Sequence, residues 1–133
     1  MKEDIRIDVR RSLLGRVRGT GAAHSGVHHW YAEEVTAMAL VPLTLWFIYS
    51  VMRLAGASRE AVVVWAGHPV NTVLLLALIA ITFHHMQLGL QVVYEDYINA
   101  KWLMNILILA TKAVALLLGL MASVAVLRMA FLA

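Results

Sequence analysis

Long apolar runs separated by short polar segments make up most of the chain after residue 31. Residues 35–52 and 61–94 carry no formal charge, and Lys112 is the single charge within a third apolar run that ends at Leu127. A helix of about 20 apolar residues crosses the hydrocarbon of a bilayer, because each residue adds about 1.5 Å. The pattern predicts an all-α membrane protein with three transmembrane helices, at about residues 33–53, 69–94 and 102–129.

Two prolines refine these helices. Pro42 lies inside the first and predicts a kink, because proline lacks the backbone N–H that continues the helical ladder. Pro69 suits the N-terminus of the second helix, where a missing N–H costs nothing. In the connection between these two helices, the run AVVVW at residues 61–65 predicts a helical turn at the membrane interface.

Composition and charge agree with a membrane location. The chain of 133 residues is 62% hydrophobic and 14% charged, whereas soluble domains carry about 25% charged residues. Lys and Arg accumulate on the cytoplasmic side of membrane proteins. Six of the eleven basic residues lie in the first 18 positions: Lys2, Arg6, Arg10, Arg11, Arg16 and Arg18. We therefore expect a cytoplasmic N-terminus, a C-terminus on the opposite side, and no nucleic-acid binding.

The chain divides into a polar, basic N-terminal arm at residues 1–31 and a three-helix transmembrane domain at residues 32–133. The glycine-containing stretch at residues 15–26 is expected to be irregular, because glycine is a poor helix former. On a helix, His24 and His28 would share one face and could bind metal, but Gly26 and the loop-like context favour interfacial polar contacts for these residues and His29. The absence of cysteine excludes disulfides, thiolate zinc sites and cysteine-bound iron–sulfur clusters within the chain.

The stretch HHMQLGLQVVYEDY, residues 84–97, places ionisable groups in the second apolar run. His84 and His85 lie about 22 Å along the helix that begins at Pro69, given its rise per residue. An ionisable group within a membrane is a candidate functional residue. A neutral imidazole is a good axial ligand for haem iron, and the alternative is a hydrogen bond to a neighbouring helix.

Helical geometry separates the two histidines. Gly89 lies one turn after His85, and Asp96, eleven residues after it, returns to within about 20° of the same face at about 16 Å along the axis. Tyr97 adds a phenol beside the acid, whereas His84 lies off this stripe. The arrangement suits a cofactor within the membrane and a polar ligand above it. The alternative is a helix-ending cluster at the headgroups, where tyrosine is common.

Residues 85–97 resemble the signature of the small hydrophobic membrane-anchor subunit of succinate dehydrogenase, respiratory complex II, in alphaproteobacteria and their relatives. That signature is a helical histidine, a glycine four residues later, a Gln-Val pair and then Asp-Tyr. The matching residues are His85, Gly89, Gln91, Val92, Asp96 and Tyr97. An SGxxH segment and a VTA helix start also match, at Ser25, Gly26, His29, Val35, Thr36 and Ala37.

The resemblance implies that His85 is one axial ligand of haem b, with the second supplied by a partner cytochrome b-type anchor subunit. Tyr97 is then expected to donate a hydrogen bond to ubiquinone, and Asp96 to support that site and its proton delivery. The implied setting is the lipid bilayer of a bacterial inner membrane. An iron–sulfur subunit and a flavoprotein subunit complete the complex, in which this chain is not catalytic alone.

One departure from the family pattern is that Glu33 and Glu34 stand where many members carry a basic residue. Two other functions remain open: a haem-free structural anchor of a fumarate reductase-like complex, and a small proton-translocating protein. The second would use a relay of His84, His85, Asp96 and Lys112.

Overall fold

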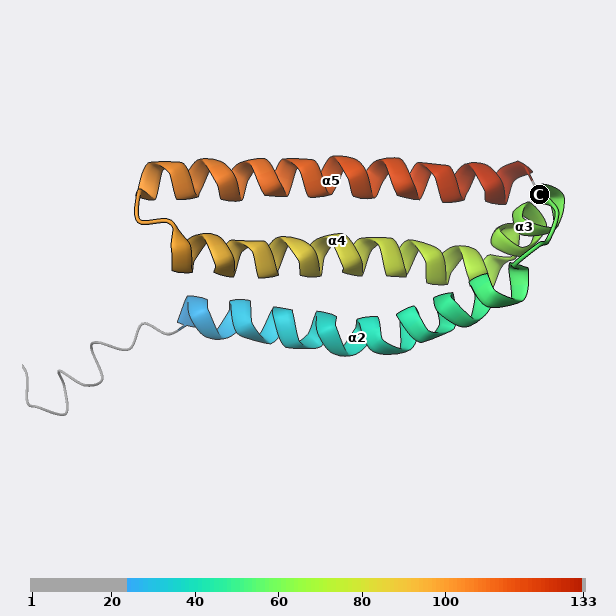
Figure 1. Ribbon diagram of the computed structural model, residues 1–133, viewed down its shortest axis with the longest axis horizontal. Helices are drawn as coiled ribbons and strands as arrows, with labels where there is room; N and C mark the ends of the chain where they lie inside the picture. Colours follow the sequence, from blue (N-terminus) through green and yellow to red (C-terminus); the bar gives the residue numbers. More distant parts are fainter. Residues whose placement is uncertain (1–23, 133) are drawn as a thin grey trace, which may run out of the picture.

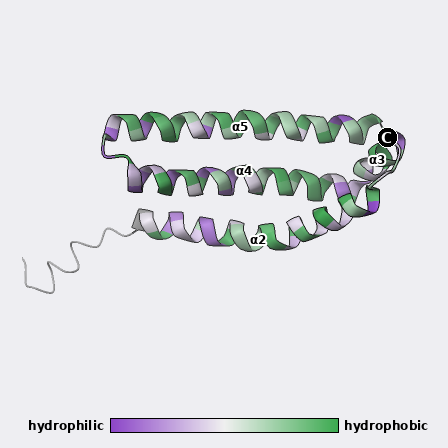
Figure 2. Ribbon diagram, in the orientation of Figure 1, coloured by the Kyte–Doolittle hydropathy of each residue, from purple (hydrophilic) through white to green (hydrophobic). Residues whose placement is uncertain are grey.

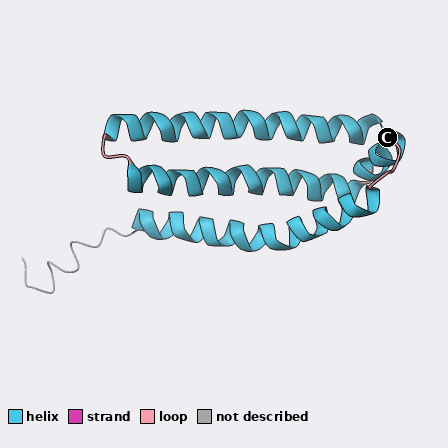
Figure 3. Ribbon diagram, viewed as in Figure 1, coloured by secondary structure: helices cyan, strands magenta, loops and turns pink. Residues whose placement is uncertain are grey.

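The protein is all-α, and its computed structural model describes residues 24–132 (Figure 3). Within this range there are four helices and no strand: α2 (His24–Leu54), α3 (Arg59–Gly67), α4 (Pro69–Tyr97) and α5 (Lys101–Leu132). Three of them, α2, α4 and α5, are long and apolar enough to cross a membrane. The predicted fold class is therefore confirmed, while residues 1–23 of the predicted arm lie outside the described residues.

All three long helices extend further than predicted. The expectation of irregular structure is wrong for residues 24–26, since α2 begins at His24, and the predicted boundary between arm and membrane domain falls inside α2. Hydropathy marks the width of the hydrocarbon, whereas backbone hydrogen bonding continues into the interface. A single glycine such as Gly26 costs a helix only about 1 kcal/mol, which is too little to stop it.

The three long helices lie side by side in a row with α4 in the middle, packed against α2 on one side and α5 on the other (Figure 1). Successive long helices run in opposite directions, so α2 begins and α4 ends at the same end of the row. We call this the α4 C-terminal end. Figure 2 shows that hydrophilic residues gather towards this end in α2 and α4, while α5 is apolar along most of its length. Pro42 lies inside α2, which is visibly bowed.

The opposite end of the row is closed by α3, which packs against α4 and α5. Ser58 caps α3, and its hydroxyl oxygen accepts a hydrogen bond from the backbone N–H of Ala61 at 3.3 Å. A hydrogen bond from its own backbone N–H, and a second from Ser58, lower the pKa of Glu60. The indole of Trp65 stacks on Trp46 of α2 with ring centroids 5.8 Å apart. The helical turn predicted in this connection is confirmed, as is the position of Pro69 at the start of α4.

Very little of this apolar chain is buried against itself. Among the described residues the buried hydrophobic side chains are Ala66, Leu75, Leu88, Ala115 and Val126. A row of helices leaves both of its broad faces open, unlike a closed bundle. An apolar surface of this extent marks contact with lipid or with another membrane protein.

Candidate functional site

The candidate site is built on the C-terminal half of α4, which runs without a break from Pro69 to Tyr97. The predicted stripe required the helix to persist as far as Asp96, and it does. His85 and Asp96 therefore share a face about 16 Å apart along the axis. The helix ends where Ile98 turns extended, with φ −109° and ψ 106°, so Tyr97 is its last residue. The stripe thus joins the apolar interior to the α4 C-terminal end.

His85 points towards α2 and is half-buried. Its Nδ1 lies 2.9 Å from Oγ1 of Thr36, a hydrogen bond between α2 and α4. In the described part of the chain no hydrogen bond engages the other ring nitrogen, Nε2. Metal-bound histidines characteristically use one nitrogen for the metal and hydrogen-bond through the other. The surroundings of His85 therefore fit an axial haem ligand.

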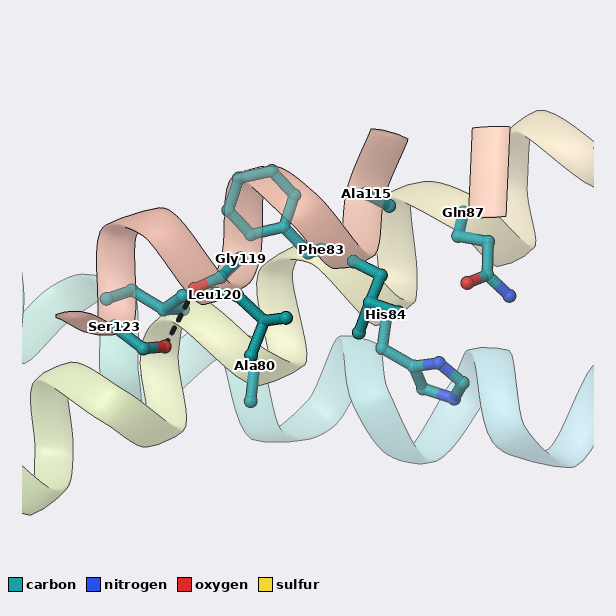
Figure 4. Close-up of a pocket in the computed structure, with 10 residues that line it drawn as sticks. Ala80, Phe83, His84, Gln87, Ala115, Gly119, Leu120 and Ser123 are labelled. Atoms are coloured by element: carbon teal, nitrogen blue, oxygen red, sulfur yellow. Dashed lines mark hydrogen bonds between the residues drawn. The ribbon is translucent and has the colours of Figure 1, made fainter. Parts of the chain in front are cut away.

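His84 has different neighbours. It is exposed and lines an open cavity of about 280 Å³ between α4 and α5, together with Gln87, Gly119 and Ser123 (Figure 4). The hydroxyl of Ser123 donates a hydrogen bond to the carbonyl of Gly119 at 2.7 Å, so it bonds within its own helix, α5. Neither His85 nor Asp96 lines this cavity. The two adjacent histidines therefore serve different helix contacts, in agreement with their separation by helical geometry.

Gly89 lies at the contact between α2 and α4, facing Glu33. A Cβ atom built on Gly89 would lie 3.9 Å from Oε1 of Glu33, with no other atom in contact. The carboxylate that departs from the family pattern thus lies at the helix contact, beside the stripe. One turn earlier on α2, Nε2 of His29 is buried without a hydrogen-bond partner. The sequence reasoning assigned no role to Thr36, although its spacing from residues 29 and 33 places all three on one face of a helix.

Asp96 and Tyr97 stand at the surface of the chain. Tyr97 is 81% exposed, and Asp96 is exposed beside it. The structure does not gather them with His85, which lies deeper in the row. Their nearest polar neighbours on α4 have partners of their own: Gln91 donates to Glu95 at 2.8 Å, and the hydroxyls of Tyr94 and Thr111 lie 3.0 Å apart. Any enclosed site around Asp96 and Tyr97 needs walls from outside the described chain.

No group of three or more metal-binding side chains exists within residues 24–132. A haem brings its own macrocycle to bind the iron, so one histidine from this chain, His85, would be enough to help hold it. Lys112 is exposed on α5, where both snorkelling and pairing with an acid remain open to it.

Comparison with known proteins gives one consistent result. Residues 9–126 match the family of the succinate dehydrogenase/fumarate reductase transmembrane subunit. The succinate dehydrogenase hydrophobic membrane anchor subunit of Rickettsia bellii is 37% identical over 109 residues, which cover 80% of this chain and 86% of the relative. Its counterpart in Rickettsia conorii is 32% identical, with 77% of this chain and 82% of the relative covered.

A more distant relative is the anchor subunit of Paracoccus denitrificans, 32% identical over 79 residues, or 59% of this chain and 61% of the relative. No solved structure gives a significant match. The family match spans all three membrane helices up to the last turn and a half of α5, and includes the whole segment from His85 to Tyr97. The chain belongs to the succinate dehydrogenase/fumarate reductase transmembrane subunit family.

Proposed function

We propose that this chain is a membrane-anchor subunit of succinate dehydrogenase that co-ligates haem b and forms part of a ubiquinone-reduction site. The observation that carries the proposal is the state of His85. It lies within an apolar span, its Nδ1 is held by Thr36, and its Nε2 has no partner in the described chain. The relatives of this chain in Rickettsia are named succinate dehydrogenase hydrophobic membrane anchor subunits, and they support the assignment to this complex.

His85 would hold the haem iron through Nε2, and a second cytochrome b-type anchor subunit would supply the other protein ligand. A bound haem b offers a one-electron carrier inside the membrane. The chain's own part is to hold the imidazole in place and to keep water away from it. Both follow from the apolar helix around His85 and from the packing of α2 against α4.

Ubiquinone is bound at the α4 C-terminal end. The phenol of Tyr97 donates a hydrogen bond to a quinone carbonyl oxygen, and Asp96 beside it exchanges protons with water. Reducing a quinone takes up protons as well as electrons, so a carboxylate at the edge of the membrane suits this step. The exposure of both side chains supports a site completed by neighbouring subunits.

The remaining subunits follow from the proposed identity of the chain as a succinate dehydrogenase anchor. The chain has no cysteine to ligate an iron–sulfur cluster, and an iron–sulfur subunit and a flavoprotein subunit carry electrons from succinate. The second anchor subunit and lipid cover the open faces of the row in the bacterial inner membrane. A haem-free anchor of a fumarate reductase-like complex is the second candidate, because the family description includes both enzymes.

The haem assignment is tested by replacing His85 with alanine in the intact complex. We expect His85→Ala to abolish or strongly perturb the b-type signal in reduced-minus-oxidised spectra, because an axial ligand is removed. His84→Ala is the matched control, since it changes the adjacent histidine on another helix face. A spectrum unchanged by His85→Ala, or an intact wild-type complex without haem, would favour the haem-free anchor.

The quinone assignment is tested by Tyr97→Phe, which removes a hydroxyl and little else. Quinone reduction by the complex should fall, while reduction of an artificial dye by the flavoprotein and iron–sulfur subunits should be preserved. Tyr49→Phe is the control. Tyr49 is also exposed, but it lies in the C-terminal half of α2, far from the α4 C-terminal end. Equal loss of both activities in Tyr97→Phe would show a defect of assembly and contradict the proposed role.

A further inference from the structure

The hydroxyl of Thr36 has three partners within hydrogen-bond distance. Its Oγ1 lies 2.7 Å from the carbonyl oxygen of Ala32, 2.9 Å from that of Glu33, and 2.9 Å from Nδ1 of His85. The two carbonyls belong to the preceding turn of α2, which is the usual place for a threonine hydroxyl to bond in a helix. Thr36 therefore links the backbone of α2 to the imidazole on α4.

Counting protons decides which way this link runs. A hydroxyl has one proton to donate, and a backbone carbonyl can only accept. If Thr36 donated its proton to Nδ1, its oxygen would face two carbonyl oxygens at 2.7 and 2.9 Å with no proton between them. The proton of Thr36 therefore goes to the α2 carbonyls, and Oγ1 accepts from an N–H on Nδ1 of His85.

We propose that Thr36 is a positioning residue for the metal-ligating histidine: it fixes His85 as the tautomer protonated at Nδ1 and orients its ring. This inference rests on the proposed function, since it presumes that Nε2 binds haem iron. In that tautomer Nε2 carries the free lone pair that a metal requires. Within an apolar span, no bulk water is at hand to replace the hydrogen bond if Thr36 is lost.

The hydrogen bond has an electronic consequence. An acceptor on Nδ1–H makes the imidazole a stronger donor at Nε2, and such partners of metal-bound histidines typically contribute about 10- to 100-fold in metal affinity. A stronger donor favours the ferric over the ferrous form. Loss of Thr36 Oγ1 should therefore weaken haem retention and raise the midpoint potential of the haem.

The test compares Thr36→Val with Thr44→Val in the purified, intact complex. Valine keeps the shape of threonine but has no hydroxyl. Thr44 is the matched control, because its hydroxyl also bonds to carbonyls of its own helix, those of Leu40 and Val41, but it is exposed and makes no bond to α4. We expect Thr36→Val to raise the midpoint potential and to speed haem transfer to apomyoglobin roughly 10- to 100-fold, with Thr44→Val near wild type.

A rescue separates hydrogen bonding from packing. Thr36→Ser retains the hydroxyl and should restore wild-type potential and haem retention; a serine variant as altered as valine would contradict the proposal. If the valine variant fails to assemble, Thr36→Cys provides the measurement. Its thiol is a weaker acceptor of similar size, so the potential should still rise, and an unchanged potential would overturn the inference.

The outcome also distinguishes this inference from the function on which it rests. If His85→Ala removes the b-type spectrum while Thr36→Val behaves like Thr44→Val, the ligand assignment stands and the role of Thr36 is wrong. If His85→Ala leaves the spectrum intact, the ligand assignment fails and the role of Thr36 fails with it.

Discussion

At the scale of single residues, the contact between α2 and α4 is where chemistry and packing coincide. His85 meets Thr36 there, and one turn further along α4 the missing side chain of Gly89 faces the carboxylate of Glu33. A glycine on this face of α4 has room beside it for either a flat macrocycle or another helix. The space beside Gly89 is next to the Glu33 side chain of α2, so within this chain Gly89 lies at a contact between two helices.

Size at position 89 should therefore control the stability of this contact. A Cβ atom fits at 3.9 Å from Glu33, so Gly89→Ala should be neutral or slightly stabilising. Gly89→Leu should destabilise by about 1–3 kcal/mol, because added methylenes crowd a packed contact. Unfolding of the purified chain in detergent, followed by circular dichroism, measures the difference.

Gly26→Leu is the control for this prediction. Gly26 is also helical, but nothing lies within 4 Å of a Cβ built on it, so leucine has space there. Equal destabilisation by leucine at positions 26 and 89 would point to an effect on the helix itself and not on its packing.

At the scale of elements, hydropathy located the helices but not their ends. The three spans were found because charges are costly in hydrocarbon, yet α2 starts at His24 and α5 continues to Leu132, beyond the apolar segments. The short helix α3 is different, since it lies in the connection and begins at a side-chain cap. Its Ser58 hydroxyl satisfies the N–H of Ala61, which has no partner inside the helix.

Removing this cap should loosen α3 specifically. Ser58→Ala should cost about 1 kcal/mol of local stability, or roughly fivefold faster hydrogen exchange across Arg59–Gly67. Ser123→Ala is the control, because Ser123 bonds to a carbonyl of its own helix and caps nothing. Unchanged exchange in α3 of the Ser58 variant would show that packing against α4 and α5 alone maintains this helix.

At the scale of the whole molecule, the two ends of the row differ. One end carries α3, the stacked Trp46–Trp65 pair and the small core around Ala66. The other carries Asp96, Tyr97 and the start of α2, which follows the basic arm in sequence. The end with the candidate site is thus the end joined to the residues that predict a cytoplasmic location.

This topology is testable because the chain has no cysteine of its own. A membrane-impermeant maleimide applied to spheroplasts should label Ala57→Cys, in the connection before α3. It should label Asn99→Cys, between α4 and α5, only after permeabilisation, since that connection is predicted to face the cytoplasm. The reverse pattern would invert the proposed orientation.

The sequence by itself determined the number and type of the membrane helices and the stripe of His85, Gly89 and Asp96. Both depend on local properties: the cost of charge in hydrocarbon and the fixed angle between successive residues of a helix. The start of α2 escaped prediction because a glycine-containing segment reads as a loop, although its cost to a helix is small.

Only the tertiary structure decided which side chains of different helices meet. Thr36 and His85 are 49 residues apart, and nothing in the spacing of either helix sets the rotation and register of α2 against α4. The packing of α2 against α4 set them. The sequence thus identified the histidine, while the contact between helices identified the hydroxyl beside it and the nitrogen that it leaves free.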